Sequence, residues 1–183
     1  MLKTMDHTGQ EKTCRVFFAL WPDAAGRDAL AAWQAPLHEM CGGRVMLPET
    51  LHVTLVFLGE VDAARLATLD LAAREVLFRP FDLALTTVSY WGHNHIVYAS
   101  PQETPLPLAD LVDGLERSLA KHHFSFARRP YKPHVSLLRN AKWNDAVLPV
   151  MPPVRWHMGG FVLVQSMGGS GGPRYRVLAQ YGA

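Results

Sequence analysis

The sequence has few cysteines, no long apolar run and no apolar leader, and each absence excludes a class of protein. Its 183 residues hold only two cysteines, Cys14 and Cys41, with no CxxC pair, so a multi-cysteine zinc site is not expected. Buried, unpaired thiols in a reducing cytoplasm are favoured over a disulfide. No hydrophobic stretch approaches the ~20 residues that cross a membrane, and the first 13 residues are polar, unlike a signal peptide.

An excess of charge is also missing. The formal net charge is +2 and the pI is about 8.6, which permits an anionic ligand but falls short of the basic balance of a long-duplex binder. With 49% hydrophobic and 19% charged residues, the chain has the composition of a globular protein that buries a sizeable core. We expect a flexible segment at 1–13, one domain at 14–183 and a cytoplasmic location with no membrane contact.

Hydrophobic periodicity predicts alternating strands and helices. The expected strands are 14–20, 51–58, 81–90, 94–99, 134–138, 160–166 and 174–181, and the expected helices are 24–40, 62–77 and 106–122. The strands at 81–90 and 94–99 are expected to form one hairpin, and Pro36 is expected to kink or end the first helix. Residues 139–158 receive no assignment, and the glycine-rich stretch 168–173 is expected to be a flexible turn. This order indicates an α+β fold with antiparallel pairing.

A four-residue motif occurs twice. Residues 52–55 read HVTL and residues 134–137 read HVSL, both within expected strands. Because strand side chains alternate, each histidine faces the same way as the hydroxyl residue two positions later, while the valine and leucine face the core. A similar HFS at 123–125 lacks the strand context and the leucine. An apolar strand has little structural reason to carry this polar pair, and its second occurrence therefore predicts a functional site.

With these motifs and their flanks, the sequence resembles the two-histidine (2H) phosphoesterases, and specifically the RNA 2′,3′-cyclic phosphodiesterases once described as 2′-5′ RNA ligases. The segments that carry the resemblance are RVFFAL at 15–20, LHVTLVFLG at 51–59, YKPHVSLLR at 131–139 and YRVL at 175–178. The resemblance implies an α+β fold of two similar lobes, related by a pseudo-two-fold axis, with one motif strand from each lobe lining a central cleft. Ser136 stands where threonine is common in the family, and it keeps the hydroxyl.

The motif residues suit the opening of a cyclic phosphate. This reaction needs a base for water and an acid for the leaving ribose oxygen, and histidine serves either role near neutral pH. Hydroxyls of Thr54 and Ser136 can donate to the non-bridging oxygens, and Arg139 matches an arginine of the family whose forked donors suit a phosphate. The resemblance implies that His52 is the proton donor to O3′ and His134 the proton acceptor from water, with a 2′-phosphate as product and no metal or cofactor.

Several other residues admit two interpretations. The candidates for RNA contacts are Arg128, Arg129, Tyr131 and Lys132, and a solvated basic loop is the alternative. Trp91 and Phe57 are candidates for base stacking or for the core. His93 and His95 share the spacing of metal ligands, but no acidic or cysteine partner is evident nearby, so no metal is expected.

Four functions compete with hydrolysis of RNA 2′,3′-cyclic phosphate ends. Two use the same site: the reverse reaction, which joins RNA ends as a 2′-5′ linkage, and action on a small cyclic nucleotide. The third is a nucleotide- or RNA-binding module without turnover, which would not require two titrating imidazoles. The fourth is a metal-dependent hydrolase, which a chelator would inactivate. We expect the hydrolase to act as a monomer on the ends of RNA chains.

Overall fold

The computed structural model describes residues 13–168 and 172–182, and the described residues form three α-helices and three antiparallel sheets. Residues 1–12 of the expected flexible segment and residues 169–171 of the expected turn lie outside the described part. Thr13 already belongs to the first strand. In the described residues, no helix has the length and apolarity to cross a bilayer.

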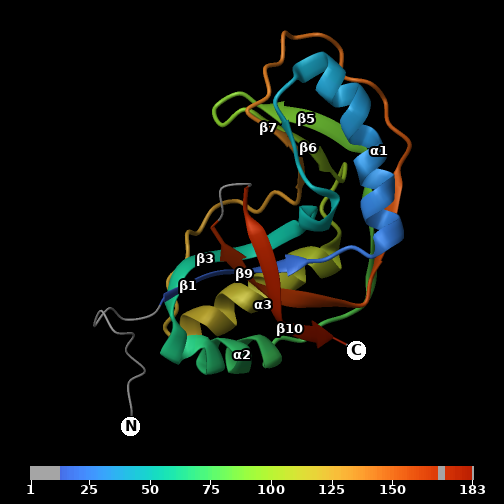
Figure 1. Ribbon diagram of the computed structural model, residues 1–183. Coiled ribbons are helices and arrows are strands. Elements are labelled where there is room, and N and C mark those ends of the chain that lie inside the picture. The colour runs from blue at the N-terminus through green and yellow to red at the C-terminus, as the bar shows by residue number, and fades with distance from the viewer. Residues whose placement is uncertain (1–12, 169–171, 183) are drawn as a thin grey trace.

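The first sheet has the strand order β10-β9-β1-β3. Its strands are β1 (Thr13–Leu20), β3 (Val53–Asp62), β9 (Gly160–Met167) and β10 (Arg174–Gly182). Helix α3 (Leu106–Lys121) packs on β3, and α2 (Leu66–Arg74) packs on α3 and β10. Both helices therefore cover one side of this sheet, as Figure 1 shows.

The second sheet has the order β2-β7-β6-β5. It consists of β2 (Arg44–Val45), β7 (Val135–Arg139), β6 (Ile96–Ser100) and β5 (Thr87–Trp91). Helix α1 (Ala24–Cys41) packs against β7 and against β8 (Val154–Met158), which pairs with β4 (Phe81–Leu85) in a two-stranded sheet. The two motif strands, β3 and β7, thus belong to different sheets, as the two-lobed α+β fold predicts.

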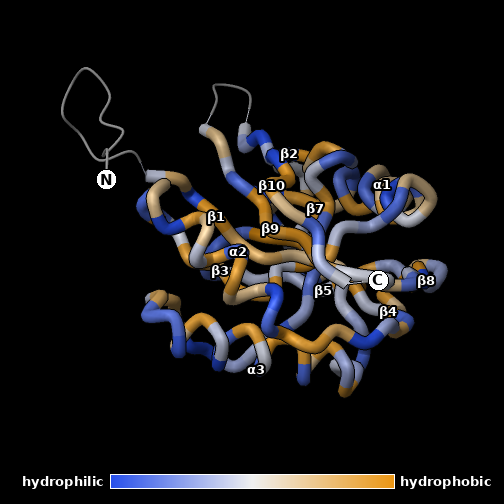
Figure 2. Tube along the Cα trace, turned by 90° about the horizontal axis from the view of Figure 1, so that it is seen from below, coloured by the Kyte–Doolittle hydropathy of each residue, from blue (hydrophilic) through white to orange (hydrophobic). Residues whose placement is uncertain are grey.

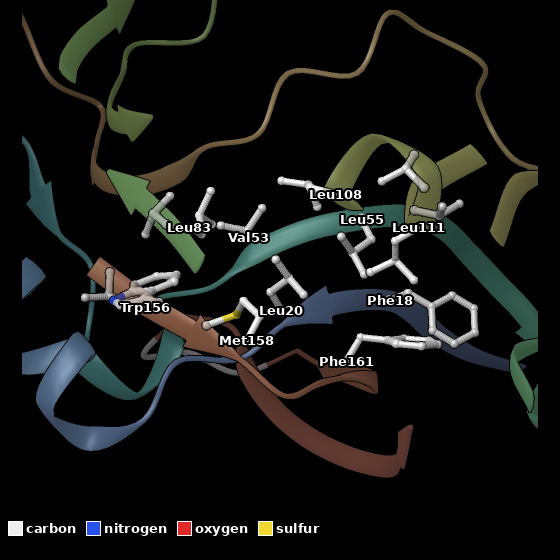
Figure 3. Close-up of a cluster of buried hydrophobic side chains, with 14 of the residues drawn as sticks. Phe18, Leu20, Val53, Leu55, Leu83, Leu108, Leu111, Trp156, Met158 and Phe161 are labelled. Carbon is white, nitrogen blue, oxygen red and sulfur yellow. The ribbon is translucent and has the colours of Figure 1, made fainter. Parts of the chain in front are cut away.

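The chain crosses between the two lobes more than once. Helix α1 follows β1 of the first sheet but packs against β7 of the second, and α3 lies between β6 and β7 in sequence but packs on β3. The main core cluster consequently contains residues of both sheets. Figure 3 shows part of it, with Leu108 and Leu111 of α3 beside Val53 and Leu55 of β3 and Phe18 and Leu20 of β1.

Strand β1 shows how the alternating pattern builds the core. Cys14, Val16, Phe18 and Leu20 point into the main cluster and are at most 7% exposed. Figure 2 accordingly shows hydrophobic residues concentrated in the central strands, including β1 and β9. Both cysteines are buried and unpaired, which confirms the prediction of apolar fillers. The alternate residues of β1 face the other side of the sheet.

Three element predictions need correction, and one unassigned stretch contains a strand. The expected strand 81–90 is two strands, because β4 pairs with β8 whereas β5 pairs with β6. The expected helix 62–77 begins as α2 at Leu66, since β3 continues to Asp62 and a 3₁₀ turn follows. The unassigned stretch 139–158 contains β8. Helix α1 continues through Pro36 to Cys41, because the adjacent turns are held in the core by Trp33 and Leu37.

Candidate active site

A cavity of about 690 Å³ lies where the two motif strands meet. All five residues predicted for catalysis and phosphate binding line it, namely His52, Thr54, His134, Ser136 and Arg139. The two histidines lie immediately before β3 and β7, one residue outside the strands, rather than within them. The structure therefore brings together the two halves of the duplicated motif, which are far apart in the sequence.

Each motif strand contains a β-bulge at the leucine of its motif. In the β1–β3 pair, Phe18 is opposite Val56 and Ala19 is opposite Thr54, which leaves Leu55 without a partner in the register. A bulge inserts one extra residue and shifts the alternation of side chains by one position. The residue three positions after Thr54, Phe57, therefore faces the cavity as well.

The same irregularity occurs in β7. Tyr98 of β6 is opposite Ser136 and Val97 is opposite Leu138, so Leu137 is the extra residue. Regular alternation would place Arg139 on the opposite face from Ser136, but both line the cavity. The bulge is thus the reason why Arg139 reaches the cavity.

A buried amide supports the second bulge. Gln34 of α1, which is 4% exposed, donates hydrogen bonds from Nε2 to the carbonyl oxygens of Leu137 (3.0 Å) and Met46 (2.8 Å). The backbone N–H of Met46 also donates to the Leu137 oxygen, at 3.0 Å. Buried polar groups are costly unless they are paired, so this network fixes the backbone of Leu137 beside the site.

The two imidazoles are held in the same way. His52 Nδ1 lies 2.7 Å from the carbonyl oxygen of Thr50, and His134 Nδ1 lies 2.8 Å from that of Lys132. Because a carbonyl oxygen only accepts, each Nδ1 carries a proton and donates it. Nε2 is then the nitrogen left for chemistry in both rings, and His52 Nε2 accepts from the Thr54 hydroxyl at 3.1 Å.

Aromatic rings surround both histidines. Trp21 stacks on His52 with a centroid distance of 5.3 Å and an interplanar angle of 11°, and Tyr175 meets the same ring edge-on at 5.2 Å. Trp91 lies edge-on to His134 at 4.5 Å, which places this predicted stacking candidate against the imidazole. These rings keep water away from one side of each histidine.

Burial changes the acidity of both imidazoles. The pKa of His52 is lowered from 6.5 to about 4, chiefly by loss of hydration; the hydrogen bond to Thr50 opposes this shift, and the charges of His134 and Arg139 add to it. Burial also lowers the pKa of His134, and the positive charge of Arg139 lowers it as well. In the unliganded protein both rings are therefore neutral at pH 7 and expose a basic Nε2.

This shift predicts a loss of stability in acid. The folded-state pKa of His52, about 4, lies below the ordinary value of 6.5, so the unfolded chain binds more protons between these values. The contribution of His52 to the free energy of unfolding is fully present above pH 6.5 and falls as the pH drops toward 4. Between pH 6.5 and 4, we expect the free energy of unfolding of wild type, measured in urea, to decrease by on the order of 2 kcal/mol more than that of His52→Gln. Equal losses would contradict the buried, neutral state of His52.

The residues predicted for RNA contacts lie outside this cavity. Arg128, Arg129 and Lys132 are exposed on the segment before β7, and the Arg128 guanidinium lies over the ring of Phe126 at 5.7 Å. Tyr131 is largely buried, which raises the pKa of its hydroxyl. That hydroxyl donates to the backbone oxygen of Thr54 at 3.1 Å, so Tyr131 ties the segment before β7 to β3.

The two histidines considered as metal ligands are His93 and His95, in the turn between β5 and β6. His95 Nδ1 lies 2.8 Å from the hydroxyl of Tyr90. Within 13–168 and 172–182, no three His, Cys, Asp or Glu side chains are grouped in a way that could hold a metal ion.

The lining residues that the sequence did not predict include four charged or aromatic side chains: Arg15, Arg44, Glu60 and Tyr175. Arg15 and Tyr175 belong to segments that carry the family resemblance, and the alternation of β1 places Arg15 on the same face as Phe17. Arg44 lies in a two-residue strand, which is too short for a periodic signal. Glu60 reaches the wall because a second bulge in β3, at Leu58, shifts the alternation again.

Comparison with known proteins identifies the family. Residues 20–98 match the family described as LigT like Phosphoesterase. The RNA 2′,3′-cyclic phosphodiesterase of Escherichia coli (strain K12) is 31% identical over 91% of this chain and 95% of its own length. The protein of the same name from Thermus thermophilus is 32% identical, with 91% and 89% covered.

Solved structures agree with the sequence relatives. The structure of E. coli LigT complexed with 3′-AMP is similar to this chain with a TM-score of 0.85 and 29% identity, covering 93% of this chain and 98% of LigT. T. thermophilus TT0787 has a TM-score of 0.76 at 27% identity, with 92% and 97% covered. The chain therefore belongs to the LigT-like phosphoesterases, the two-histidine family that its duplicated motif predicts.

Proposed function

We propose that this protein hydrolyses the 2′,3′-cyclic phosphodiester at the end of an RNA chain to a 2′-phosphate, with two histidines as acid and base and without a metal ion. The observation that carries the proposal is the matched pair of imidazoles, each tied through Nδ1 to the carbonyl oxygen two residues earlier. Both line one cavity with two hydroxyls and Arg139. The names of the E. coli and T. thermophilus relatives support this substrate class.

In the proposed mechanism, His134 Nε2 takes a proton from water as the water oxygen bonds to phosphorus. The P–O3′ bond breaks, and His52 Nε2–H gives its proton to O3′, so the products are a 2′-phosphate and a free 3′-hydroxyl. Thr54 and Ser136 donate to the non-bridging oxygens as their negative charge grows, and Arg139 balances that charge. His134 then releases its extra proton to solvent, and His52 takes up a proton from solvent.

The anionic substrate supplies the acid that this mechanism needs. In the empty site the pKa of His52 is about 4, so the free enzyme rarely carries the required proton at neutral pH. A bound phosphate places negative charge beside the ring and raises its pKa. Binding of the substrate and protonation of His52 are thus coupled.

The test is incubation of the purified protein, in EDTA, with an oligoribonucleotide that ends in a 2′,3′-cyclic phosphate. A 2′-phosphate end is the expected product. A 3′-phosphate would contradict the assignment of the leaving group, and activity lost to EDTA would indicate a metal-dependent hydrolase. Tight binding without turnover would indicate a binding module instead. Joined products at high concentrations of 5′-hydroxyl ends would reveal the reverse reaction.

The acidity of the histidines predicts the pH dependence of the rate. The reaction needs one neutral and one protonated imidazole, and kcat/KM reports their pKa values in the free enzyme. Since burial lowers both values, we expect a bell-shaped profile of kcat/KM with its maximum below pH 6.5. The maximum of kcat should lie at higher pH, because bound phosphate raises both values. A kcat/KM that still increases above pH 7 would contradict the assignment.

The proposal also covers contacts with RNA outside the cavity, the oligomeric state of the protein and its location in the cell. Arg128, Arg129 and Lys132 are exposed, and they are proposed to contact phosphates of the RNA beyond the terminal nucleotide. We also propose that the protein acts as a monomer in the cytoplasm, where unpaired thiols such as those of Cys14 and Cys41 persist.

A further inference from the structure

Two arginines of the cavity wall face each other across a strand pair. Arg44 of β2 is directly opposite Arg139 of β7 in the antiparallel register, and both line the cavity. Like charges at directly opposed positions destabilise a sheet. An anion between or beside the two guanidinium groups would relieve this repulsion, so their pairing points to a ligand with negative charge.

The charges on the wall exceed what the reacting phosphate needs. Arg15, Arg44 and Arg139 line the cavity, and Glu60 is the only carboxylate among its described lining residues. Glu60 is the register partner of Arg15 across β1 and β3, which leaves two arginines without an acidic neighbour in the register. A cyclic phosphodiester carries a single negative charge. Arg139 follows the second motif and serves that group, so Arg44 remains for another.

Arg44 lies between the main cavity and a smaller neighbouring one. Its guanidinium reaches Gly172, where an added Cβ would lie 2.9 Å from Nη1. Arg44 thus extends from the second sheet to the residues just before β10 of the first. It also lines an adjoining cavity of about 180 Å³, together with Leu47 and Pro173. The wall of the main cavity continues into this second space through Arg44.

Tyr175 adds a neutral donor to the same place. Its ring packs edge-on against His52 at 5.2 Å. The charges of Arg139, Arg15 and Arg44 all act on its hydroxyl, although burial is the larger influence and raises its pKa. The hydroxyl therefore keeps its proton at neutral pH and can donate it to a phosphate oxygen.

We propose that Arg44 and the Tyr175 hydroxyl form a subsite for a second phosphate, the one on C5′ of the terminal nucleotide. This inference rests on the proposed function and narrows its substrate. In an RNA chain, that phosphate joins the terminal nucleotide to its neighbour and is the phosphate nearest to the reacting one. The subsite would make the enzyme prefer RNA ends over nucleoside 2′,3′-cyclic monophosphates, which lack it.

The experiment compares kcat/KM for two substrates that differ only in this group, adenosine 2′,3′-cyclic phosphate with and without a 5′-phosphate. A charge-assisted contact of ~1.5–3 kcal/mol corresponds to a preference of roughly 10- to 100-fold for the 5′-phosphorylated substrate. In Arg44→Gln the ratio should fall to a few-fold at most, because only the neutral donor of Tyr175 remains. Arg44→Lys should give an intermediate ratio, because it keeps the charge but loses the forked donors. Arg155→Gln, at an exposed position of β8, removes the same charge elsewhere and should keep the wild-type ratio.

The outcomes separate this inference from the proposed function. A wild-type ratio near 1, or a ratio that Arg44→Gln leaves intact, would overturn the subsite. If wild type hydrolyses neither substrate nor an oligoribonucleotide, the proposed function fails, and binding then decides the subsite. Wild type should bind adenosine 2′,5′-bisphosphate at least tenfold more tightly than adenosine 2′-phosphate, and Arg44→Gln should not. Equal affinities in wild type would overturn the inference.

Discussion

Replacement of either His134 or His52 by alanine is expected to lower kcat on an oligoribonucleotide 2′,3′-cyclic phosphate by roughly 10²–10⁴-fold, as for the loss of a general acid or base. The structure leaves one nitrogen of each ring, Nε2, for this role, because Nδ1 is bonded to a backbone oxygen. Single-turnover rates with saturating enzyme measure the chemical step directly. Each variant should also lose one limb of the bell-shaped pH profile, because one titrating group is gone.

An exposed histidine provides the matched control. His157 of β8 pairs with Asp82 at 2.8 Å, and its side chain is 71% exposed. His157→Ala removes the same ring at a position that does not line the cavity and should keep the wild-type rate. Near-normal activity in both His52→Ala and His134→Ala would refute the account, whereas loss in only one would remove the other from the acid–base pair.

Replacement of Thr54 by valine is expected to lower kcat by roughly 10²–10³-fold, the effect of losing one preorganised donor to a developing negative charge. Valine has nearly the shape of threonine, so the packing of β3 should persist. The bond from Tyr131 reaches the backbone oxygen of Thr54 and does not involve the side chain that changes. The change also removes the 3.1 Å bond from this hydroxyl to His52 Nε2, which should lower the stability by about 1 kcal/mol. The larger loss should therefore appear in kcat, and both can be measured on the same preparation.

The effects of Thr54→Val on kcat and on KM show at which stage the hydroxyl acts. Loss of a donor that acts only in the transition state lowers kcat and kcat/KM equally. Loss of a donor that binds the substrate and the transition state equally well raises KM alone. Thr104→Val, at an exposed loop position, is the control for the exchange of threonine for valine. A kcat within threefold of wild type for Thr54→Val would contradict the role of this hydroxyl.

The sequence predicts the central features of the site because they follow a local pattern. The repeated His-Val-Thr/Ser-Leu motif lies at the start of two apolar strands, and alternation correctly places the valines and leucines in the core. The strand and helix assignments at 14–20, 24–40 and 106–122 are close to β1, α1 and α3. The two helices each bury one apolar stripe, and β1 is a short run of mostly apolar residues, so local information suffices.

Other features depend on contacts that no local pattern records. The bulges at Leu55 and Leu137 arise from pairing with β1 and β6, and the second is fixed by Gln34 from α1, which is 103 residues away in the sequence. Position in the sequence alone places Arg139 five residues after His134 but does not explain how its side chain faces the cavity. The opposition of Arg44 and Arg139 likewise exists only once β2 has paired with β7.

The misassigned strand 81–90 has a similar cause. Residues on both sides of Thr86 have strand character, and the pattern does not show that β4 leaves for β8 while β5 continues to β6. The partner β8 alternates buried and exposed residues but is only five residues long, and it directly follows two prolines in a stretch rich in proline and tryptophan. Pairing between such distant segments is decided by the whole fold, so it could not be read from either segment alone.

Phosphorus NMR of one oligoribonucleotide 2′,3′-cyclic phosphate, incubated in EDTA with wild type, His52→Ala and His134→Ala, tests the two-imidazole mechanism most directly. With wild type, the cyclic phosphate resonance should be replaced by that of a 2′-phosphomonoester, and with either variant it should persist over the same time. Conversion at wild-type speed by both variants, or a 3′-phosphomonoester as the product, would contradict the claim that these two rings act on opposite sides of one phosphorus atom.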